Sequence, residues 1–147
     1  MSNDIERIKE LAHKMRSAIE AVPRQERPIG LSDFPSGACG DSALLLGAYL
    51  NDCGVEGFVY VHGERWSDER NSRISHAWLA RETLVVDIAA DQFPDAPGPI
   101  IVEDRSQWHQ TFQIEGNTES CDFRVSWSGL GIDPLHHLYA LLQKGLV

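Results

Sequence analysis

Residues 34–50 read FPSGACGDSALLLGAYL, a proline- and glycine-rich loop that runs directly into an apolar segment. Pro35 and Gly37 are typical turn residues, and Ser36 can cap a helix by accepting a hydrogen bond from one of its first N–H groups. Because residues 43–50 are apolar on almost every side, we expect this helix to be enclosed by the rest of the fold. The sequence therefore predicts a central helix that carries Cys39 at its N-terminal end.

The position of Cys39 favours a nucleophilic reactivity that a cysteine elsewhere would lack. At a helix N-terminus the backbone N–H groups are unpaired and the helix dipole is positive, which favours the nucleophilic thiolate. Asp41 lies in the same first turn, where the dipole also favours a carboxylate. A free cysteine is more commonly a small buried apolar residue, so this segment alone leaves both interpretations open.

Composition and length limit the classes of function. The chain has 147 residues, which predicts one domain over residues 1–147 with a sizeable core. Its formal net charge is 13 − 22 = −9, so there is no electrostatic basis for binding nucleic acid or an anionic membrane. No apolar segment approaches the roughly 20 residues that span a bilayer, and the N-terminus lacks the features of a secretory signal. Three cysteines, an odd number, argue against a disulfide framework and for a reducing, cytoplasmic compartment.

Hydrophobic patterning predicts an α+β fold. The buried Cys39 helix, which we expect to end at Cys53-Gly54, packs against an antiparallel or mixed sheet between two flanking helices. A helical period predicts the first flanking helix over residues 4–21, with His13 exposed, and a cap at Asp133 predicts the second. Residues 64–73 are charged and without periodicity, which indicates an exposed loop, with Trp66 either as an anchor on the body or as part of a binding rim. Strands are predicted at residues 57–63, 74–80, 83–89, 100–102 and 123–127.

A register count brings a histidine and an aspartate together. If Arg81-Glu82 forms the turn between the strands at 74–80 and 83–89, His76 lies directly opposite Asp87. Opposed residues of an antiparallel pair have Cβ atoms about 4.5–5.5 Å apart on one face. A carboxylate in an apolar strand needs a partner, and it would orient the imidazole and favour its charged form. A purely structural His–Asp pair is the alternative; with Cys39 nearby, the three would form a nucleophile–base–orienter triad.

Three short motifs then carry a family resemblance over residues 34–93. Gly37-Ala-Cys-Gly-Asp before a helix, Ser75-His-Ala-Trp-Leu on one strand and Val86-Asp-Ile on the next resemble the transglutaminase-like branch of the papain-like cysteine enzymes. The resemblance implies a papain/transglutaminase-like core. It also implies Cys39 as the nucleophile, His76 as general base and acid, and Asp87 as the residue that orients the imidazole. The implied activity is that of a peptidase, deamidase, amide hydrolase or acyl transferase that forms a thioester acyl-enzyme on a peptide, protein or small amide.

The chain departs from the papain pattern in one functional position. That pattern places an oxyanion-hole glutamine shortly before the cysteine, and residues 31–38 contain none. The remaining candidates for oxyanion or substrate binding are Gly37, Gln92 and Trp78, and the sequence does not choose among them. The missing glutamine and short chain keep open an alternative function, a catalytically silent binding or inhibitory module.

Metal and cofactor sites are not indicated. The chain has no Cys-x-x-Cys or His-Glu-x-x-His spacing and no phosphate-binding or dinucleotide-binding glycine motif, so we expect neither a metal nor a cofactor. His109, beside Trp108, is a possible pocket residue. Nothing in the pattern specifies an oligomeric state.

Overall fold

The computed structural model describes residues 2–125, 127 and 132–146. Its helices are α1 (Ser2–Ala21), α2 (Cys39–Asp52), the short α3 (Gln107–Gln110) and α4 (Ile132–Gln143). Its strands are β1 (Val59–Ser67), β2 (Ser72–Arg81), β3 (Leu84–Asp87), β4 (Ile101–Asp104), β5 (Gln113–Ile114) and β6 (Glu119–Ser120). The expectation of an α+β fold with an antiparallel sheet is confirmed.

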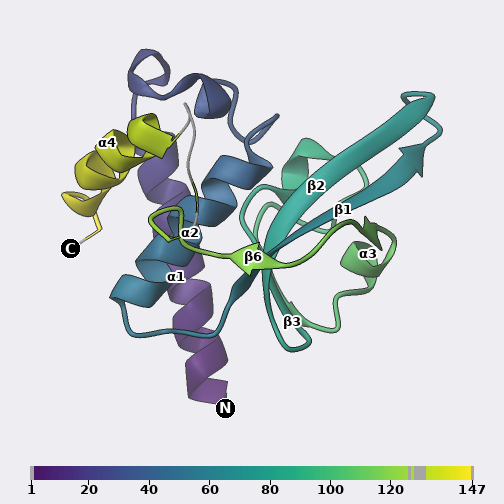
Figure 1. Ribbon diagram of the computed structural model, residues 1–147, viewed down its shortest axis with the longest axis horizontal. Helices are drawn as coiled ribbons and strands as arrows, with labels where there is room; N and C mark the ends of the chain where they lie inside the picture. The colour runs from purple at the N-terminus through teal and green to yellow at the C-terminus, as the bar shows by residue number, and fades with distance from the viewer. Residues whose placement is uncertain (1, 126, 128–131, 147) are drawn as a thin grey trace.

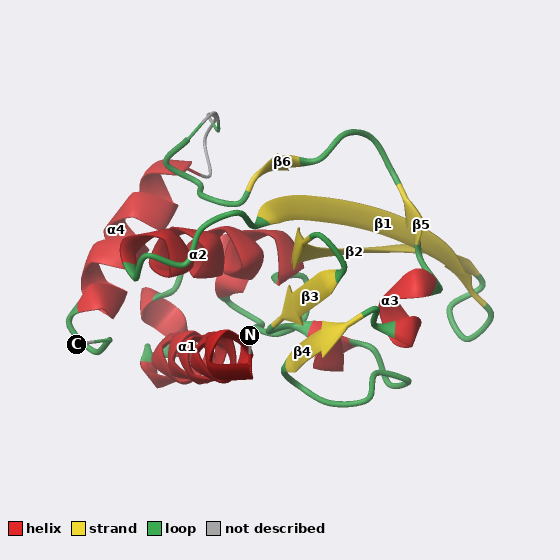
Figure 2. Ribbon diagram, turned by 90° about the horizontal axis from the view of Figure 1, so that it is seen from below, coloured by secondary structure: helices red, strands yellow, loops and turns green. Residues whose placement is uncertain are grey.

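The sheet runs in the order β4-β3-β2-β1-β5, and β6 pairs with the start of β1, at Val59 and Tyr60. Helices α1, α2 and α4 gather on one side of the molecule, whereas the sheet and α3 occupy the other (Figures 1 and 2). Within the described residues, no helix combines the length and apolar character that crossing a bilayer requires.

The helical side holds the main core. The predicted stripe of α1 is buried, from Ile8 to Ile19, and His13 on the opposite side is exposed, as expected. Residues 43–50 of α2 are buried on every side and pack against α1 and against Leu79 and Val86 of the sheet. Each such large apolar side chain contributes roughly 1.5–3 kcal/mol when it is fully buried. Helix α2 is therefore the central, enclosed helix that the apolar run predicted.

The start of α2 differs from the prediction in one detail. Its N-cap residue is Ala38, and no side chain caps it. Ser36 instead lies one turn earlier, where its N–H donates to the carbonyl of Asp33. The loop makes this extra turn because Gly37 adopts a left-handed φ of 69°, a conformation that costs glycine little. The first N–H groups of α2 are consequently left without a side-chain partner.

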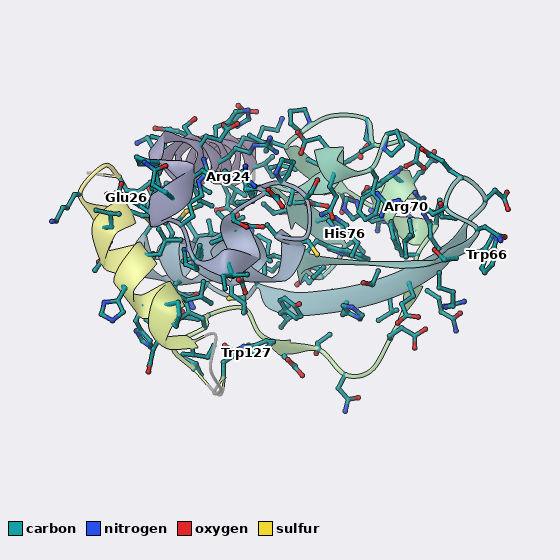
Figure 3. All side chains as sticks on the ribbon, turned by 90° about the horizontal axis from the view of Figure 1, so that it is seen from above. Arg24, Glu26, Trp66, Arg70, His76 and Trp127 are labelled. Carbon is teal, nitrogen blue, oxygen red and sulfur yellow. The ribbon has the colours of Figure 1, made fainter. Side chains whose placement is uncertain are left out.

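The charged segment 64–73 is not an exposed loop, so that prediction is wrong. Strand β1 continues to Ser67 and β2 begins at Ser72, and the two pair as a long ribbon whose register includes Glu64 opposite Ser75. Main-chain hydrogen bonds of the ladder form regardless of side-chain polarity, and the ion pair of Arg73 with Glu64 bridges the strands at 3.0 Å. Trp66 is 54% exposed near the end of this ribbon and does not anchor it (Figure 3).

The strand predicted at residues 123–127 is also absent from the described part of that segment. Phe123 and Arg124 lie in a turn, which Asp122 holds by accepting the N–H of Arg124 on its side chain and that of Val125 on its carbonyl. Side chains of aspartate compete with the sheet ladder in this way. Helix α4 includes Asp133 within its first turn. The glycines at positions 129 and 131 favour a turn before this helix, and both lie outside the described residues.

Candidate active site

The β2–β3 hairpin has a register two residues away from the predicted one. Arg81 pairs with Leu84 and Ala80 with Val85, so the turn is Glu82-Thr83 rather than Arg81-Glu82. Glu82 takes a left-handed φ of 55°, which a glutamate does not signal in a sequence. Because side chains alternate with a period of two, a shift of two residues leaves each one on its original face. His76 and Asp87 therefore share a face but are diagonal neighbours, not directly opposite.

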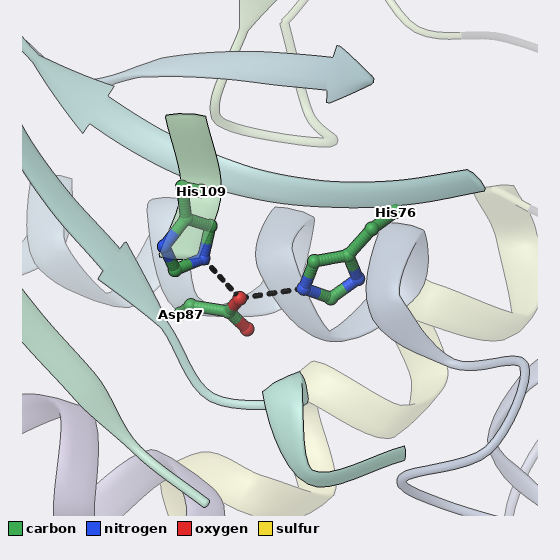
Figure 4. Close-up of side chains that lie close together, drawn as sticks. All are labelled: His76, Asp87 and His109. Carbon is green, nitrogen blue, oxygen red and sulfur yellow. Dashed lines mark hydrogen bonds and ion pairs between the residues drawn. The ribbon is translucent and has the colours of Figure 1, made fainter. Parts of the chain in front are cut away.

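The diagonal arrangement still brings the two side chains into contact. His76 Nε2 lies 2.5 Å from Asp87 Oδ2, and both side chains are almost completely buried (Figure 4). Burial alone would lower the pKa of His76, but the hydrogen bond to Asp87, assisted by Cys39, raises it to about 9. Burial opposes the charge on Asp87 as well, yet hydrogen bonds from His109 and His76 hold its pKa below the ordinary value of a carboxyl.

These contacts define the tautomer of His76. An ionised carboxylate only accepts hydrogen bonds, so Nε2 carries the proton and Nδ1 of the neutral ring presents a lone pair. Nδ1 is buried and makes no hydrogen bond with any described residue. Cys39 is close enough to His76 to stabilise its protonated form, although its thiol does not form a regular hydrogen bond to Nδ1. Cys39 itself is half-buried at the tip of α2, so the structure brings the three predicted residues together.

The N-terminus of α2 supplies the next feature of the site. The first N–H groups of a helix have no intrahelical partners, and no side chain caps this one. The Cys39 N–H therefore remains a donor for a negative group beside the sulfur. The hydroxyl of Tyr60 lies near Gly40 at the same helix end, 3.1 Å from where a Cβ on that glycine would stand. Burial, with Cys39 contributing, raises the pKa of Tyr60 to about 12, so it stays a neutral O–H donor.

A second histidine, His109, completes the buried cluster. Its Nε2 lies 2.7 Å from the same Asp87 oxygen that His76 contacts, and its Nδ1 lies 2.6 Å from Ser106 Oγ (Figure 4). The sequence indicated His109 only as a possible pocket residue and predicted no role for Ser106. The spacing Ser-x-x-His, in which the serine caps a short helix, is the local signal that could have joined these two.

The group of His76, Asp87 and His109 also has the composition of a metal site, with ligand atoms within 4.8 Å of one another. Zinc at about 2.0–2.1 Å from each ligand would hold tetrahedral donor atoms roughly 3.3 Å apart. Both ring nitrogens instead approach one carboxylate oxygen at 2.5 and 2.7 Å, which leaves no room for an ion between them. This spacing is that of hydrogen bonds.

Aromatic rings surround His76. Its ring centroid lies between 5.0 and 5.7 Å from those of Trp78, Phe93, Trp108 and Phe112. Such packing excludes water from the ion pair and restricts the ring to one orientation, which strengthens the interaction with Asp87.

The three oxyanion or substrate-binding candidates have different positions. Gly37 is exposed in the loop two residues before Cys39. Gln92 donates its side-chain amide to the carbonyl of Ala89 at 3.0 Å, so that amide is already engaged. Trp78 is buried beside His76 and lines a groove of about 660 Å3, together with Val61, Val85 and His109.

Comparison of the chain with protein-family models, with curated proteins and with solved structures finds no match.

Proposed function

We propose that this protein is a cysteine-dependent amide hydrolase or acyl transferase with a papain/transglutaminase-like core. One observation carries the proposal. The buried Nδ1 of His76 has no hydrogen-bond partner among the described residues, the opposite nitrogen is bonded to Asp87, and Cys39 is the neighbouring group with a transferable proton. An unpaired buried polar atom is costly, and one placed beside a thiol is the geometry of a general base.

The chemistry follows from these positions. Nδ1 of His76 takes the proton from Cys39 Sγ, and the resulting thiolate attacks the carbonyl carbon of an amide. Negative charge develops on the carbonyl oxygen, where the Cys39 N–H and the Tyr60 hydroxyl are the nearby donors. His76 then returns the proton to the departing nitrogen, the C–N bond breaks and a thioester remains on Cys39. Water or an amine resolves that thioester, so the substrate is a peptide, a protein or a small amide.

Asp87 acts through His76 rather than on the substrate. It fixes the Nε2–H tautomer and stabilises the imidazolium that forms when the thiol is deprotonated. The chemistry needs a reduced thiol, which fits the reducing, cytoplasmic compartment that the cysteine count suggests.

Limited alkylation tests the proposal. With a substoichiometric dose of iodoacetamide at pH 6–7, Cys39 reacts before Cys53 and Cys121, as measured by peptide mass spectrometry. Cys53 is the matched control because it is half-buried like Cys39 and also lies at an end of α2. His76→Gln slows the alkylation of Cys39 by about tenfold or more, because it removes the group that accepts the thiol proton and whose positive charge then stabilises the thiolate, and it leaves Cys53 unchanged. Equal rates for Cys39 and Cys53 in the unmodified protein would rule out the nucleophile.

A binding or inhibitory module is the second candidate function. The engaged amide of Gln92 and the largely apolar groove beside Trp78 favour it, because the first removes one predicted oxyanion donor and the second offers a surface without a nucleophile. Cys39→Ala separates the two functions: it abolishes acyl chemistry, whereas a binding module keeps its biological effect.

A further inference from the structure

We propose that His109 is a positioning residue of this site, which takes part of the charge of Asp87 and thereby sets how tightly His76 holds its proton. This inference rests on the proposed function, because it concerns the base of the same site.

The carboxylate of Asp87 is bonded at both oxygens. Oδ2 accepts from both His76 Nε2 at 2.5 Å and His109 Nε2 at 2.7 Å, and Oδ1 accepts from the N–H of Ala89 at 2.9 Å. The two histidine side chains and Asp87 are 0–2% exposed, so water does not compete for these bonds. Two imidazoles thus draw on the negative charge of one oxygen atom.

His109 is held in the tautomer that this role needs. Its Nε2 must carry a proton to donate to the carboxylate, so Nδ1 of the neutral ring is an acceptor. Ser106 Oγ lies 2.6 Å from that Nδ1 and supplies the O–H donor, while the same oxygen caps α3 by accepting the backbone N–H of His109. Ser106 is 1% exposed and its hydroxyl is engaged in the hydrogen bond to this ring, so it orients His109 and is not itself a nucleophile.

The titratable groups that face His76 are few. Among the described residues they are Cys39 from α2, Asp87 from β3 and His109 from α3, whose ring stacks 6.1 Å from that of His76. The remaining neighbours are the aromatic rings described above, which carry no net charge. A change at His109 is therefore transmitted to His76 mainly through Asp87.

The sign of the effect follows from competition for the carboxylate. A hydrogen bond from His109 stabilises the ionised carboxylate and makes it a weaker acceptor for the proton of His76. Removing that bond leaves His76 as the sole side-chain partner of Oδ2. His76 then binds its proton more firmly, which makes it a stronger base toward Cys39 and its imidazolium a weaker acid toward the departing nitrogen.

Two substitutions at His109 separate this role from simple packing. His109→Gln keeps an N–H donor near the position of Nε2, whereas His109→Leu fills the space without a donor. Both are made in a Cys39→Ser background, so that the thiol does not titrate with the ring. The pKa of His76 is read from histidine NMR resonances, which His76→Gln identifies.

We expect His109→Leu to raise the pKa of His76 by roughly half to one unit, a fraction of the shift that a neighbouring charge produces, and His109→Gln to leave it unchanged. A folded Leu variant with an unchanged pKa, or a Gln variant with an equal shift, would overturn the inference. If the Leu variant does not fold, Ser106→Ala decides in its place: releasing Nδ1 of His109 raises the pKa of His76 by a smaller amount, and no shift is the contrary result.

The alkylation test keeps the two claims apart. If Cys39 reacts no faster than Cys53 while the His109 variants shift the pKa of His76, the enzyme proposal fails and the charge sharing stands. If Cys39 is the fastest thiol but the His109 variants shift nothing, only the role of His109 is lost.

Discussion

His76 binds a proton more tightly in the folded chain than an exposed imidazole does. Its pKa rises from 6.5 to about 9 because the hydrogen bond and charge of Asp87, with Cys39, outweigh the cost of burial. Between these two values the folded state holds a proton that the unfolded chain has released, so the free energy of unfolding falls as the pH rises. The stabilisation is complete below about pH 6.5 and is lost by the time the pH has passed the folded-state value.

This linkage gives the prediction at the residue scale. Urea unfolding is measured between pH 6 and 10 in the presence of a reductant. Over this range the free energy of unfolding of the unmodified protein falls by a few kcal/mol more than that of His76→Gln, since each pKa unit corresponds to 1.36 kcal/mol. His13→Gln is the control, because His13 is exposed on α1 and this variant follows the unmodified protein. A His76→Gln variant that loses stability over the same range as the unmodified protein contradicts the linkage.

Single residues also show how far the sequence could predict the site. Asp87 stands out because an apolar strand cannot bury a carboxylate without a partner, and His76 lies within reach on the same face. His109 could not be assigned in this way, because it comes from a four-residue helix in a segment without periodicity. The register was wrong because the Glu82-Thr83 turn lacks the Asn-Gly type of signal that fixes two-residue hairpins.

At the scale of elements, α2 is fixed by a close approach of backbone to backbone. A Cβ placed on Gly47 would lie 1.8 Å from the carbonyl oxygen of Cys121, so the segment before the Asp122 turn packs directly on the helix. A glycine inside an apolar helix can allow such an approach, but the sequence does not identify the partner, which lies 74 residues away along the chain.

Gly47→Ala tests this packing. In an isolated helix the change stabilises by about 1 kcal/mol, because alanine is the better helix former. Here the added methyl group meets rigid backbone, and overpacking of this kind destabilises by about 1–3 kcal/mol or more, measured as a lower midpoint of urea unfolding.

Gly98→Ala is the matched control for that measurement. No atom lies within 4 Å of a Cβ at Gly98, and its φ is not left-handed, so stability stays within about 0.5 kcal/mol. Equal midpoints for the two variants would mean that the segment at Cys121 does not rest on α2.

The helices and strands differ in how clearly the sequence pattern predicts them. Helices α1 and α2 have clear apolar patterns, and Gly54 marks the end of α2 with a left-handed φ of 79°. The outer half of the β1–β2 ribbon has no such pattern, because its ladder satisfies the backbone while both faces carry charged and polar side chains. Charge alone therefore did not distinguish a loop from a strand.

At the scale of the molecule, the site depends on elements that meet only in the folded chain. Cys39 comes from α2, His76 from β2, Asp87 from β3 and His109 from α3. Arg16 of α1 donates to the carbonyl of Ile88, the residue directly after Asp87, at 2.9 Å, and also to the carboxylate of Asp91. The helical core and the site are therefore connected through hydrogen bonds as well as through packing.

This connection predicts that reactivity and fold disappear together. Brief pulses of iodoacetamide across a urea series give the alkylation rate of Cys39 relative to Cys53, and tryptophan emission gives the unfolding curve, because Trp78 and Trp108 flank His76. A cooperative two-state transition makes both signals change at one midpoint, at which the buried Cys121 also becomes reactive. If the advantage of Cys39 persists beyond that midpoint, it belongs to the local sequence around the thiol, and if it is lost well before, the site opens independently of the core. Only a shared midpoint agrees with a nucleophile that owes its reactivity to His76 and Asp87.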